Sequence, residues 1–538
     1  MIDLNPKHLK TIQSILAEYV PTYEVRAFGS RVKWTAKDYS DLDLAVVGND
    51  PLSLRQRGQL ADAFEESNLP IRVDVLDWQS ISERFRQVIL EKYEVIQKAK
   101  PVNQNGNAEG INGNWSTKRE WQVKVFGDCA TLVRESVSPS DLGDTPYIGL
   151  EHIGENTLSL IGHGIASDVT STKSRFRAGD ILFGKLRCYF RKVARARFDG
   201  VCSTDIWVTR AKEGIDQSFL YYCMASQSFV DFADSGSIGT RMPRTKWEWV
   251  SRYKVHLPPL QEQRRIAYIL STLDEKIALN QQMNETLEAT TRAIFKSWFV
   301  NFDPVKAKTD GRKPPCMDPE TAALFPSAFQ DSPLRRIPKG WQVGTIDEDF
   351  NLTMGQSPPG STYNEDEKGV PFYQGSKDFG FRYPARRVYC TTPKRFAEKG
   401  DTLVSVRAPV GDINMASEKC NIGRGVAAVR HKTGSRSYTY YTMQFLQDVF
   451  SRYEAEGTVF GSINKTDFQT LTHLRPPNEI IEVFERLVHP LDQTIENNEN
   501  ESRALAQTRD TLLPKLLSGE IRIDDAAKIL EENDGGKS

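Results

Sequence analysis

Residues 257–263 read LPPLQEQ and open a long run in which apolar residues recur three or four positions apart, the spacing of an amphipathic helix. A second run opens at 475–479 with RPPNE. Positions within the first run recur 218 residues later, among them Leu273 as Leu491, Asp274 as Asp492, Ile277 as Ile495, Asn280 as Asn498 and Leu287 as Leu505. A repeat of this length indicates two copies of one large unit, and two copies of a binding unit suggest a target with two parts.

The runs predict two long helices, over 258–302 and 476–521. About 40 residues at a rise of 1.5 Å would span roughly 60 Å, which exceeds the width of a small domain. Pairing the two apolar stripes in an antiparallel, coiled-coil-like spacer would bury both. The alternative is two independent domains, each with its helix packed on its own sheet.

Composition is that of a soluble globular protein, with 39% hydrophobic and 26% charged residues among 538. No stretch approaches the roughly 20 apolar residues of a membrane span, and the first residues contain no apolar signal segment. The seven cysteines form no CxxC pair, which favours reduced thiols and a cytoplasmic location over a disulfide scaffold or a zinc site. A net charge of −1 gives no global sign of nucleic-acid binding, so charge has to be considered region by region.

Each long run follows a region of short apolar segments broken by Gly, Asp and Pro, which predicts β-rich structure. Residues 173–197 hold nine basic side chains and one acid, and 236–246 form a second basic, Gly-containing stretch. Basic loop residues neutralise phosphates or read base edges, although a charge run can also be a solvated face. We select these residues as candidates for DNA binding: Lys185, Arg187, Arg191, Lys192, Arg241, Arg244 and Lys246 in the first copy, and Arg407, Arg424 and Lys465 in the second.

This half resembles the specificity subunits of type I restriction-modification systems. The resemblance rests on LPPLQEQ and its helix (257–287), the echo at 475–505, LLPKLLSGEI (512–521), and the Gly-Asp-Ile-Leu and Gly-Ser-Ile segments. It implies two target-recognition domains that each read half of a bipartite double-stranded DNA sequence. It also implies partner subunits: two modification subunits that use S-adenosylmethionine, and restriction subunits that translocate DNA with ATP. The PPLQEQR and PPNEIIE junctions differ, so we expect unequal partner contacts.

The first hundred residues show an α/β pattern, with helix-like stretches at 8–20 and 82–99 and strand-like stretches at 25–30, 41–48 and 71–78. Gly29, Ser30 and Arg31 follow the first strand. Asp41 and Asp43 share one face of the second strand, because residues two apart point the same way, and Asp74 lies in the third. Three carboxylates suit Mg²⁺, which would bridge the phosphates of a nucleotide. The alternative is a surface turn with ordinary acids.

The pattern resembles the minimal nucleotidyltransferases of the polymerase-beta superfamily, over residues 8–98. The resemblance implies Mg²⁺-dependent transfer of a nucleoside monophosphate from a nucleoside triphosphate to a hydroxyl. Asp41 and Asp43 would be metal ligands, Asp74 a base or third ligand, and Gly29, Ser30 and Arg31 the nucleotide-binding turn. Small members often act as antitoxins that modify a toxin. Trp34 stands where a small residue is common, so an inactive nucleotide-binding or docking module is the alternative.

The expected fold is an α+β multidomain chain. Its segments are a nucleotidyltransferase-like domain (1–100), a linker (101–116), recognition domain 1 (117–257), spacer helix 1 (258–302), a connector (303–337), recognition domain 2 (338–475), spacer helix 2 (476–521) and an acidic tail (522–538). The expected function is a DNA specificity subunit with an appended nucleotidyltransferase-like domain. A second hypothesis is a nucleotidyltransferase that the repeated half recruits to DNA or to a restriction complex.

Overall fold

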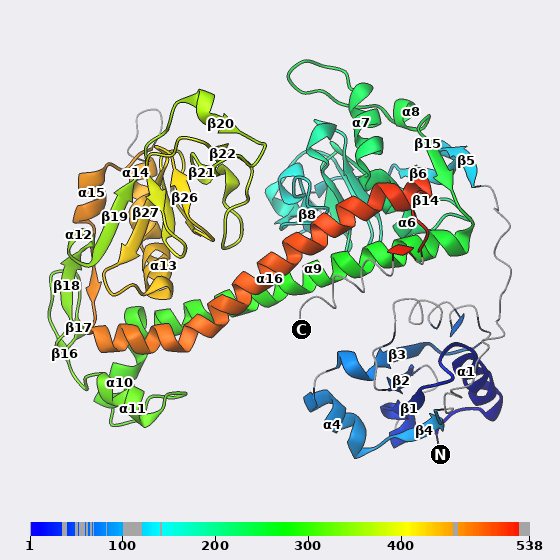
Figure 1. The fold of residues 1–538 in the computed structure, drawn as a ribbon, viewed down its shortest axis with the longest axis horizontal. Coiled ribbons are helices and arrows are strands. Elements are labelled where there is room, and N and C mark those ends of the chain that lie inside the picture. Colours follow the sequence, from blue (N-terminus) through cyan, green and yellow to red (C-terminus); the bar gives the residue numbers. More distant parts are fainter. Residues whose placement is uncertain are drawn as a thin grey trace. The chain divides into compact units, whose positions relative to one another are not determined.

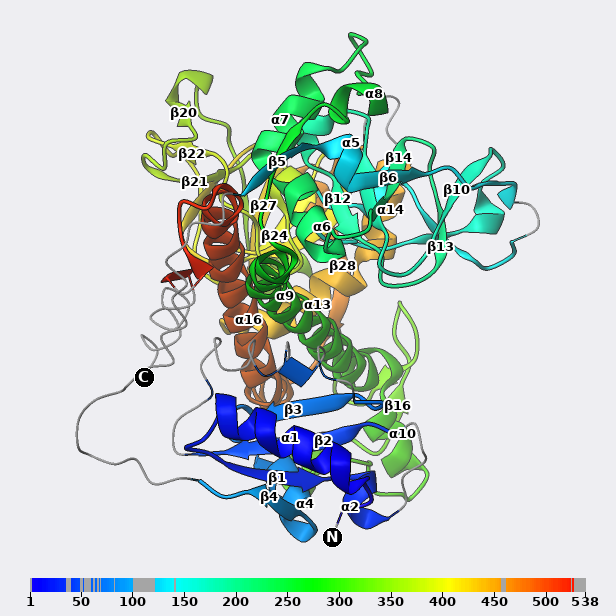
Figure 2. The same ribbon diagram turned by 90° about the vertical axis from the view of Figure 1, so that its right-hand side faces the viewer.

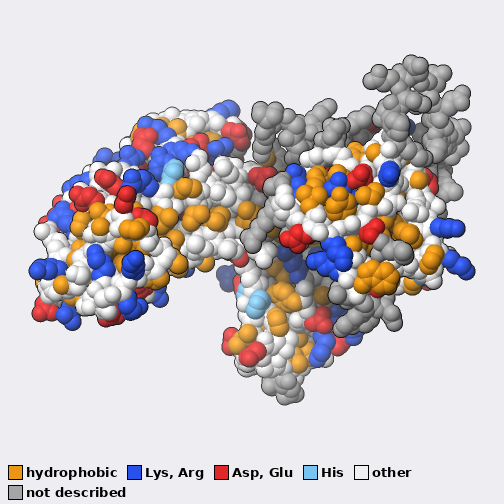
Figure 3. Space-filling view, turned by 90° about the horizontal axis from the view of Figure 1, so that it is seen from below, with side chains coloured by type: hydrophobic (Ala, Val, Ile, Leu, Met, Phe, Trp, Pro, Cys, Tyr) orange, Lys and Arg blue, Asp and Glu red, His pale blue; other side chains and the backbone are white. Residues whose placement is uncertain are grey.

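A computed structural model describes residues 2–34, 40–48, 52, 60, 63–64, 67, 69–81, 83–99, 121–139, 142–455, 461–523 and 525–526. The chain forms two compact units, residues 1–275 with 506–538 and residues 276–505 (Figure 1). No helix among the described residues is long and apolar enough to cross a membrane. On the face drawn in Figure 3, acidic and basic side chains are interspersed.

A four-stranded sheet with the order β3-β2-β1-β4 forms the front of the chain. Its strands are β1 (Glu24–Phe28), β2 (Leu42–Val47), β3 (Val73–Asp77) and β4 (Glu94–Gln97). β2 runs parallel to β3 and antiparallel to β1. The helix α1 (Pro6–Tyr19) buries Ile12 and Leu16 against one face of the sheet. On the other face Ile89, from α4 (Glu83–Glu91), packs with Phe28 and Ala45.

The prediction of one helix over 82–99 is wrong in its second half. The helix α4 ends at Glu91, and residues Glu94–Gln97 form the strand β4. This strand pairs antiparallel with β1 and buries Ile96 in the core. Val95 and Ile96 are β-branched residues, which favour a pleated, half-buried surface. The free edge of β1 gives them that surface, so tertiary pairing overrides the helical spacing.

The β-rich domain of the first unit contains two sheets, with the orders β12-β11-β14-β6 and β7-β10-β13-β8-β9. The first consists of β6 (Ala130–Val133), β11 (Ile181–Gly184), β12 (Val193–Arg195) and β14 (Ile206–Ala211). The second consists of β7 (Ser136–Val137), β8 (Pro146–Ile148), β9 (Gly164–Ile165), β10 (Lys173–Phe176) and β13 (Gly200–Cys202).

Two helices follow these sheets, α6 (Gln217–Ala225) and α7 (Gln227–Ser235). Each begins at a residue whose side chain accepts a hydrogen bond from an otherwise unpaired backbone amide. Asp216 accepts from the amide of Phe219, and Ser226 accepts from that of Phe229. The caps make α6 and α7 two separate helices, with their apolar side chains buried.

The β-rich domain of the second unit repeats this layout. Its four-stranded sheet has the order β19-β27-β24-β25, which answers β6-β14-β11-β12. These strands are β19 (Phe350–Met354), β24 (Thr402–Val406), β25 (Val410–Met415) and β27 (Val426–His431). The parallel pair β8–β13 recurs as β21 (Val370–Tyr373) with β26 (Cys420–Ile422). The helices α13 (Arg436–Phe445) and α14 (Gln447–Ala455) answer α6 and α7.

An ion pair is repeated with the fold. Asp180 accepts two hydrogen bonds from the Arg210 guanidinium, at 2.6 and 2.8 Å. At the same place in the second copy, Arg430 Nε lies 2.5 Å from Asp401 Oδ1. Both carboxylates also accept a backbone amide of their own turn. These residues therefore hold a β-turn to its sheet in each domain.

The two long helices are α9 (Leu260–Phe295), which continues as a π-helical turn (Lys296–Asn301), and α16 (Asn478–Ser518). They lie side by side in both ribbon views (Figures 1 and 2). In the second unit Lys276 pairs with Glu501, and in the first Asp274 pairs with Arg509. Because later residues of one helix meet earlier residues of the other, the helices are antiparallel. The predicted fold class is confirmed.

Buried asparagines occupy the interior of this helix pair in the second unit. The Asn280 side-chain amide donates to Glu501 at 2.8 Å and to the Asn498 carbonyl at 3.4 Å. Asn498 donates to the Asn284 side chain at 2.9 Å. A buried asparagine between paired helices costs stability and fixes their register. The repeat that places Asn498 opposite Asn280 therefore also sets how the helices align.

Candidate functional site

The three carboxylates of the front domain gather around β2. Asp43 lies opposite Asp74 in the parallel register of β2 and β3, and Asp41 is exposed just before β2. Burial raises the pKa of Asp43, and the negative charges of Asp74 and Asp41 raise it further. Like charges this close disfavour full ionisation, so a bound cation would relieve the repulsion.

Gly29 brings the backbone against this group. Its φ of +80° suits glycine, and a methyl group at this position would lie 2.2 Å from Asp43 Oδ2. Ser30 begins the short helix α2 (Ser30–Lys33) directly afterwards. The predicted Gly-Ser turn therefore lies beside the predicted carboxylates.

Arg31 has a different environment from its neighbours. Its guanidinium is buried and donates to the Ser40 carbonyl at 2.9 and 2.6 Å and to the Asp3 carbonyl at 2.9 Å. These bonds hold the segment that leads into Asp41. Trp34 has a left-handed φ of 60° and is 60% exposed. The loop that follows it, residues 35–39, lies outside the described residues.

The donor chemistry of the site fits a hard cation, because carboxylate oxygen is the ligand that Mg²⁺ prefers. Gly29 leaves room beside Asp43 that any side chain would fill. Asp74 is paired with Arg72, whose Nε lies 2.9 Å from Asp74 Oδ1. Within the described ranges, no three His, Cys, Asp or Glu side chains are placed ready to hold a metal. Asp74 would have to exchange this partner to join the other two carboxylates around an ion.

The basic residues predicted in 173–197 separate onto different parts of the first domain. Arg191 is buried, donates to the Ala225 carbonyl at 2.7 Å and lies 3.2 Å from Asp510 of α16. Lys192 donates to the Leu150 carbonyl at 2.8 Å. Both side chains are engaged inside the unit, and their charges hold the fold together in this structure.

The other five candidates of the first copy come together around one hairpin. The segment between α7 and α8 (Trp247–Val250) projects as a long loop in Figure 1. Ile238 and Arg244 pair across it, and Arg244 also pairs with Leu186. The Arg187 guanidinium donates to the Arg241 carbonyl at 3.0 Å. Two stretches that are about 50 residues apart in sequence thus form one surface, which contains Lys185, Arg187, Arg241, Arg244 and Lys246.

One acid at the root of this hairpin was missed by sequence reasoning. Asp205 accepts two hydrogen bonds from the Arg244 guanidinium, at 2.8 and 3.0 Å. Hydrogen bonding from Arg244 lowers the pKa of Asp205. Asp205 lies 39 residues before Arg244 in a turn of ordinary composition, so no local pattern identifies it.

The second copy places its candidates around the equivalent junction. Arg407 pairs with Ser462 as Leu186 pairs with Arg244, and the Ile463 amide donates to the Val406 carbonyl. Arg407, Arg424 and Lys465 are exposed. Residues 456–460, which precede this junction in the sequence, lie outside the described residues. The same backbone hydrogen bond occurs in both domains: the Lys185 amide donates to the Asp205 carbonyl, and the Val406 amide donates to the Gly425 carbonyl. Gly425 therefore stands where the first domain has Asp205.

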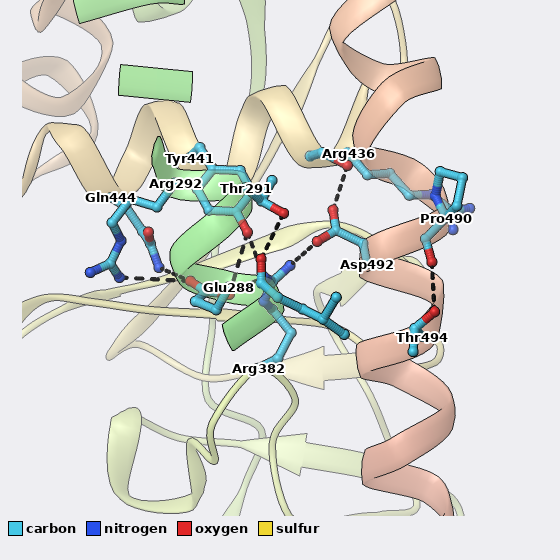
Figure 4. Close-up of polar contacts among 12 residues, drawn as sticks. Glu288, Thr291, Arg292, Arg382, Arg436, Tyr441, Gln444, Pro490, Asp492 and Thr494 are labelled. Atoms are coloured by element: carbon cyan, nitrogen blue, oxygen red, sulfur yellow. Dashed lines mark hydrogen bonds and ion pairs between the residues drawn. The ribbon is translucent and has the colours of Figure 1, made fainter. Parts of the chain in front are cut away.

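A buried charge cluster anchors the second domain to the long helices (Figure 4). Arg382 is 0% exposed, and its guanidinium binds Asp492 of α16 at 2.9 Å, Glu288 of α9, and the Tyr441 hydroxyl at 2.7 Å. Ser437 donates to Asp492 and Gln444 donates to Glu288. Three parts of the unit are therefore tied to one cation. The sequence repeat marked Asp492 but gave no sign of its partner.

The first unit answers this cluster with a different cation. Asp274, which corresponds to Asp492, accepts from the Tyr222 hydroxyl at 2.7 Å and pairs with Arg509 at 2.6 Å. Tyr222 lies on α6 of the globular domain, whereas Arg509 lies on α16. The repeated aspartate thus takes its arginine from a helix in one copy and from the globular domain in the other.

Comparison with known proteins covers both halves of the chain. A family model described as the type I restriction modification DNA specificity domain matches residues 118–289 and 338–507. A second model, described as polymerase beta nucleotidyltransferase, matches residues 10–101. The first match covers the basic candidate residues of both β-rich domains, and the second match covers the three carboxylates.

Individual relatives agree with these models. The putative type I restriction enzyme MjaX specificity subunit of Methanocaldococcus jannaschii is 27% identical over 425 residues, which cover 75% of this chain and 94% of the relative. The HindI specificity subunit of Haemophilus influenzae is 25% identical over 474 residues, 75% of this chain and 100% of the relative. A probable protein adenylyltransferase, MntA of Haemophilus influenzae, is 50% identical over 97 residues, 18% of this chain and 85% of the relative.

Proposed function

This chain belongs to the type I restriction modification DNA specificity family and carries a front domain of the polymerase beta nucleotidyltransferase family, and from this membership we propose that it is the DNA specificity subunit of a type I restriction-modification complex. Each β-rich domain would read one half of a bipartite double-stranded DNA target. The chain would direct methylation and restriction by partner subunits, which supply the S-adenosylmethionine and ATP chemistry. We propose two modification subunits and the restriction subunits as its partners.

The observation that supports this proposal is the duplicated backbone junction, which has exposed basic side chains beside it in both domains. Arg187, Arg241 and Lys246 are exposed at it in the first copy, and Arg407 and Lys465 in the second. Exposed Arg and Lys side chains on loops neutralise phosphates and read base edges. The helices α9 and α16 each run unbroken from one unit into the other. We propose that they fix the separation of the half-sites, and that the domain boundaries are those expected from the sequence.

Methylome sequencing of cells that carry the complete system tests this role. We expect a methylated motif with two specific halves and a nonspecific gap, and we expect it to disappear when this chain is deleted. An insertion of one helical repeat into both α9 and α16 should lengthen the gap and leave the halves unchanged. Methylation that does not depend on this chain would refute the proposal.

For the front domain, we propose a Mg²⁺-dependent nucleotidyltransferase. Asp41 and Asp43 would hold the metal, with Asp74 as base or third ligand, and Gly29 and Ser30 would receive the phosphates. An acceptor hydroxyl would form a bond to the α-phosphorus of a nucleoside triphosphate, its proton would pass to Asp74, and pyrophosphate would leave. The metal supplies charge neutralisation at the phosphates. What supports this is the Asp43–Asp74 register with Gly29 against it.

Labelling with radioactive ATP, GTP or CTP tests the second proposal. The full chain is incubated with Mg²⁺ and its partner subunits, and label transferred to protein is measured. Wild type should transfer label, and the Asp41→Asn, Asp43→Asn double variant should not. Lys33→Gln, an exposed change on α2, serves as the matched control and should keep transfer. If the wild-type chain transfers no label, the nucleotidyltransferase proposal is refuted, and the front domain is an inactive nucleotide-binding or docking module.

A further inference from the structure

The hairpin formed by residues 236–246 has a firmly held root and an exposed tip. The Ile238 and Arg244 backbones exchange two hydrogen bonds at 3.0 and 3.1 Å. The amide of Arg187 donates to the Pro243 carbonyl at 2.9 Å, and that of Thr245 to the Lys185 carbonyl at 3.0 Å. The tip is therefore hydrogen-bonded on both sides before it meets any ligand.

The root also packs against a ring that is itself fixed. A methyl group at Gly236 would lie 2.1 Å from the Trp249 ring, so only glycine allows this approach. The Trp249 indole donates to the Phe232 carbonyl at 2.8 Å and stacks on the Phe232 ring. At the turn itself Gly239 has a φ of +112°. The backbone of the hairpin thus follows a course that few other sequences could adopt.

The tip presents apolar side chains to solvent in a basic setting. Ile238 is 64% exposed and Met242 is 49% exposed. Exposed apolar side chains that gather in one patch are typical of a binding surface. Arg241 lies between them in sequence, and its guanidinium has no hydrogen bond or ion pair to any described residue. The nearby carboxylate, Asp205, is neutralised by Arg244. The tip therefore offers the Arg241 guanidinium and two apolar side chains, while the Asp205 carboxylate is engaged by Arg244.

We propose that Arg241 and Met242 read bases of the first DNA half-site, and that Arg187, Asp205 and Arg244 are positioning residues that hold this tip. An arginine fork matches the acceptors at the edge of guanine, and an apolar side chain matches the thymine methyl group. Arg187 acts through its bond to the Arg241 carbonyl, and Arg244 through Asp205. The inference rests on the proposed DNA-specificity function and deepens it, because it separates arginines that read from arginines that position.

The charge of Asp205 makes the inference testable. If Asp205 only repelled DNA, its replacement by Asn would strengthen binding to every sequence. As a positioning residue, its replacement should instead relax discrimination at one half-site. Asp205 and Arg244 both lie in the first domain, so variants of this pair should leave the second half-site unchanged. The second domain has Gly425 at the place of Asp205.

Selection from a randomised duplex pool with the full chain and its partner subunits provides the assay. Wild type should enrich one bipartite motif; failure to enrich any motif would refute the proposed function itself. Arg241→Gln and Met242→Ala should lower the preference for the first half-site by about tenfold or more, with the second half-site unchanged. Asp205→Asn and Arg244→Gln should relax the same bases. Arg197→Gln, an exposed change elsewhere in this domain, is the matched control.

Salt dependence separates base reading from phosphate binding. The slope of log affinity against log salt falls by about one for each phosphate that the protein no longer neutralises. We expect Lys246→Gln to lower the slope by about one without changing the motif, and Arg244→Gln to leave the slope unchanged. An unaltered first half-site in Arg241→Gln would overturn the inference, as would stronger binding of Asp205→Asn with an unaltered motif. Equal melting temperatures of Arg244→Gln and wild type would exclude misfolding as the cause.

Discussion

Replacing Arg382 by Met should loosen the second domain from the long helices. The substitution removes the buried cation between Glu288 and Asp492 and leaves two carboxylates with side chains only 11% exposed. Removing one partner of a buried ion pair costs about 3–5 kcal/mol. Ser437 and Gln444 still donate to the two carboxylates, so we expect the lower end, about 3 kcal/mol. That energy corresponds to roughly a 150-fold larger open population.

Hydrogen exchange of the α16 amides between 478 and 505 measures this effect, because it reports local opening in a chain of several domains. Protection should fall by roughly two orders of magnitude in this segment. In a triple variant that also carries Glu288→Gln and Asp492→Asn, most of the protection should return, since no uncompensated charge is left. A loss below about 1 kcal/mol in Arg382→Met, or a triple variant no better than the single one, would refute this reasoning.

Three further predictions concern other parts of the chain. Gly29→Ala would drive a methyl group into the Asp43 carboxylate, so nucleotide transfer should fall to background in the labelling assay; wild-type transfer would contradict the site. Burial raises the pKa of Glu499 to about 7, so the folded state holds this proton better than the unfolded state, and stability should fall as pH rises from about 4.5 to 7. Glu499→Gln should therefore raise the urea midpoint at pH 8 and leave it nearly unchanged at pH 5. Equal gains at both pH values would contradict a raised pKa of Glu499. Asn280 Oδ1 is buried without a partner among the described residues, so Asn280→Leu should not lower the thermal midpoint, whereas a clear fall in calorimetry would show that its amide contributes net stability.

The sequence was sufficient for the repeated architecture because the two helices carry their pattern locally. Apolar spacing and the recurrence of Asp274 as Asp492 predicted both helices and their pairing. The front sheet was also largely predictable, down to Asp43 and Asp74 on neighbouring strands. The exception was β4, where the free edge of β1 decided between strand and helix. Such a competition between elements cannot be seen within one segment.

Side chains that act over long sequence distances were the least predictable. Composition placed Arg191 and Lys192 in a basic run, but the fold turns both inward to carbonyl groups. Asp205 and Arg382 showed no pattern at all, because their partners lie on other elements far away in the chain. The hairpin surface emerged only when the structure joined Arg187 to Arg241. The assignments of base-reading and metal-binding residues stay predictions until the variants are measured.

The different origins of Arg382 and Arg509 affect how freely each recognition domain can be exchanged. A replacement for the second domain must bring its own buried arginine, or Asp492 loses its ion-pair partner and Glu288 keeps only Arg292, whose Nη2 lies 3.7 Å from Glu288 Oε1. The first domain faces an aspartate already neutralised by Arg509 and contributes only the Tyr222 hydroxyl. We therefore expect grafts of foreign sequence to be tolerated more readily at the first position. The two attachment points on the long helices, at Asp274 and Asp492, are alike in sequence but would require different side chains from an incoming domain.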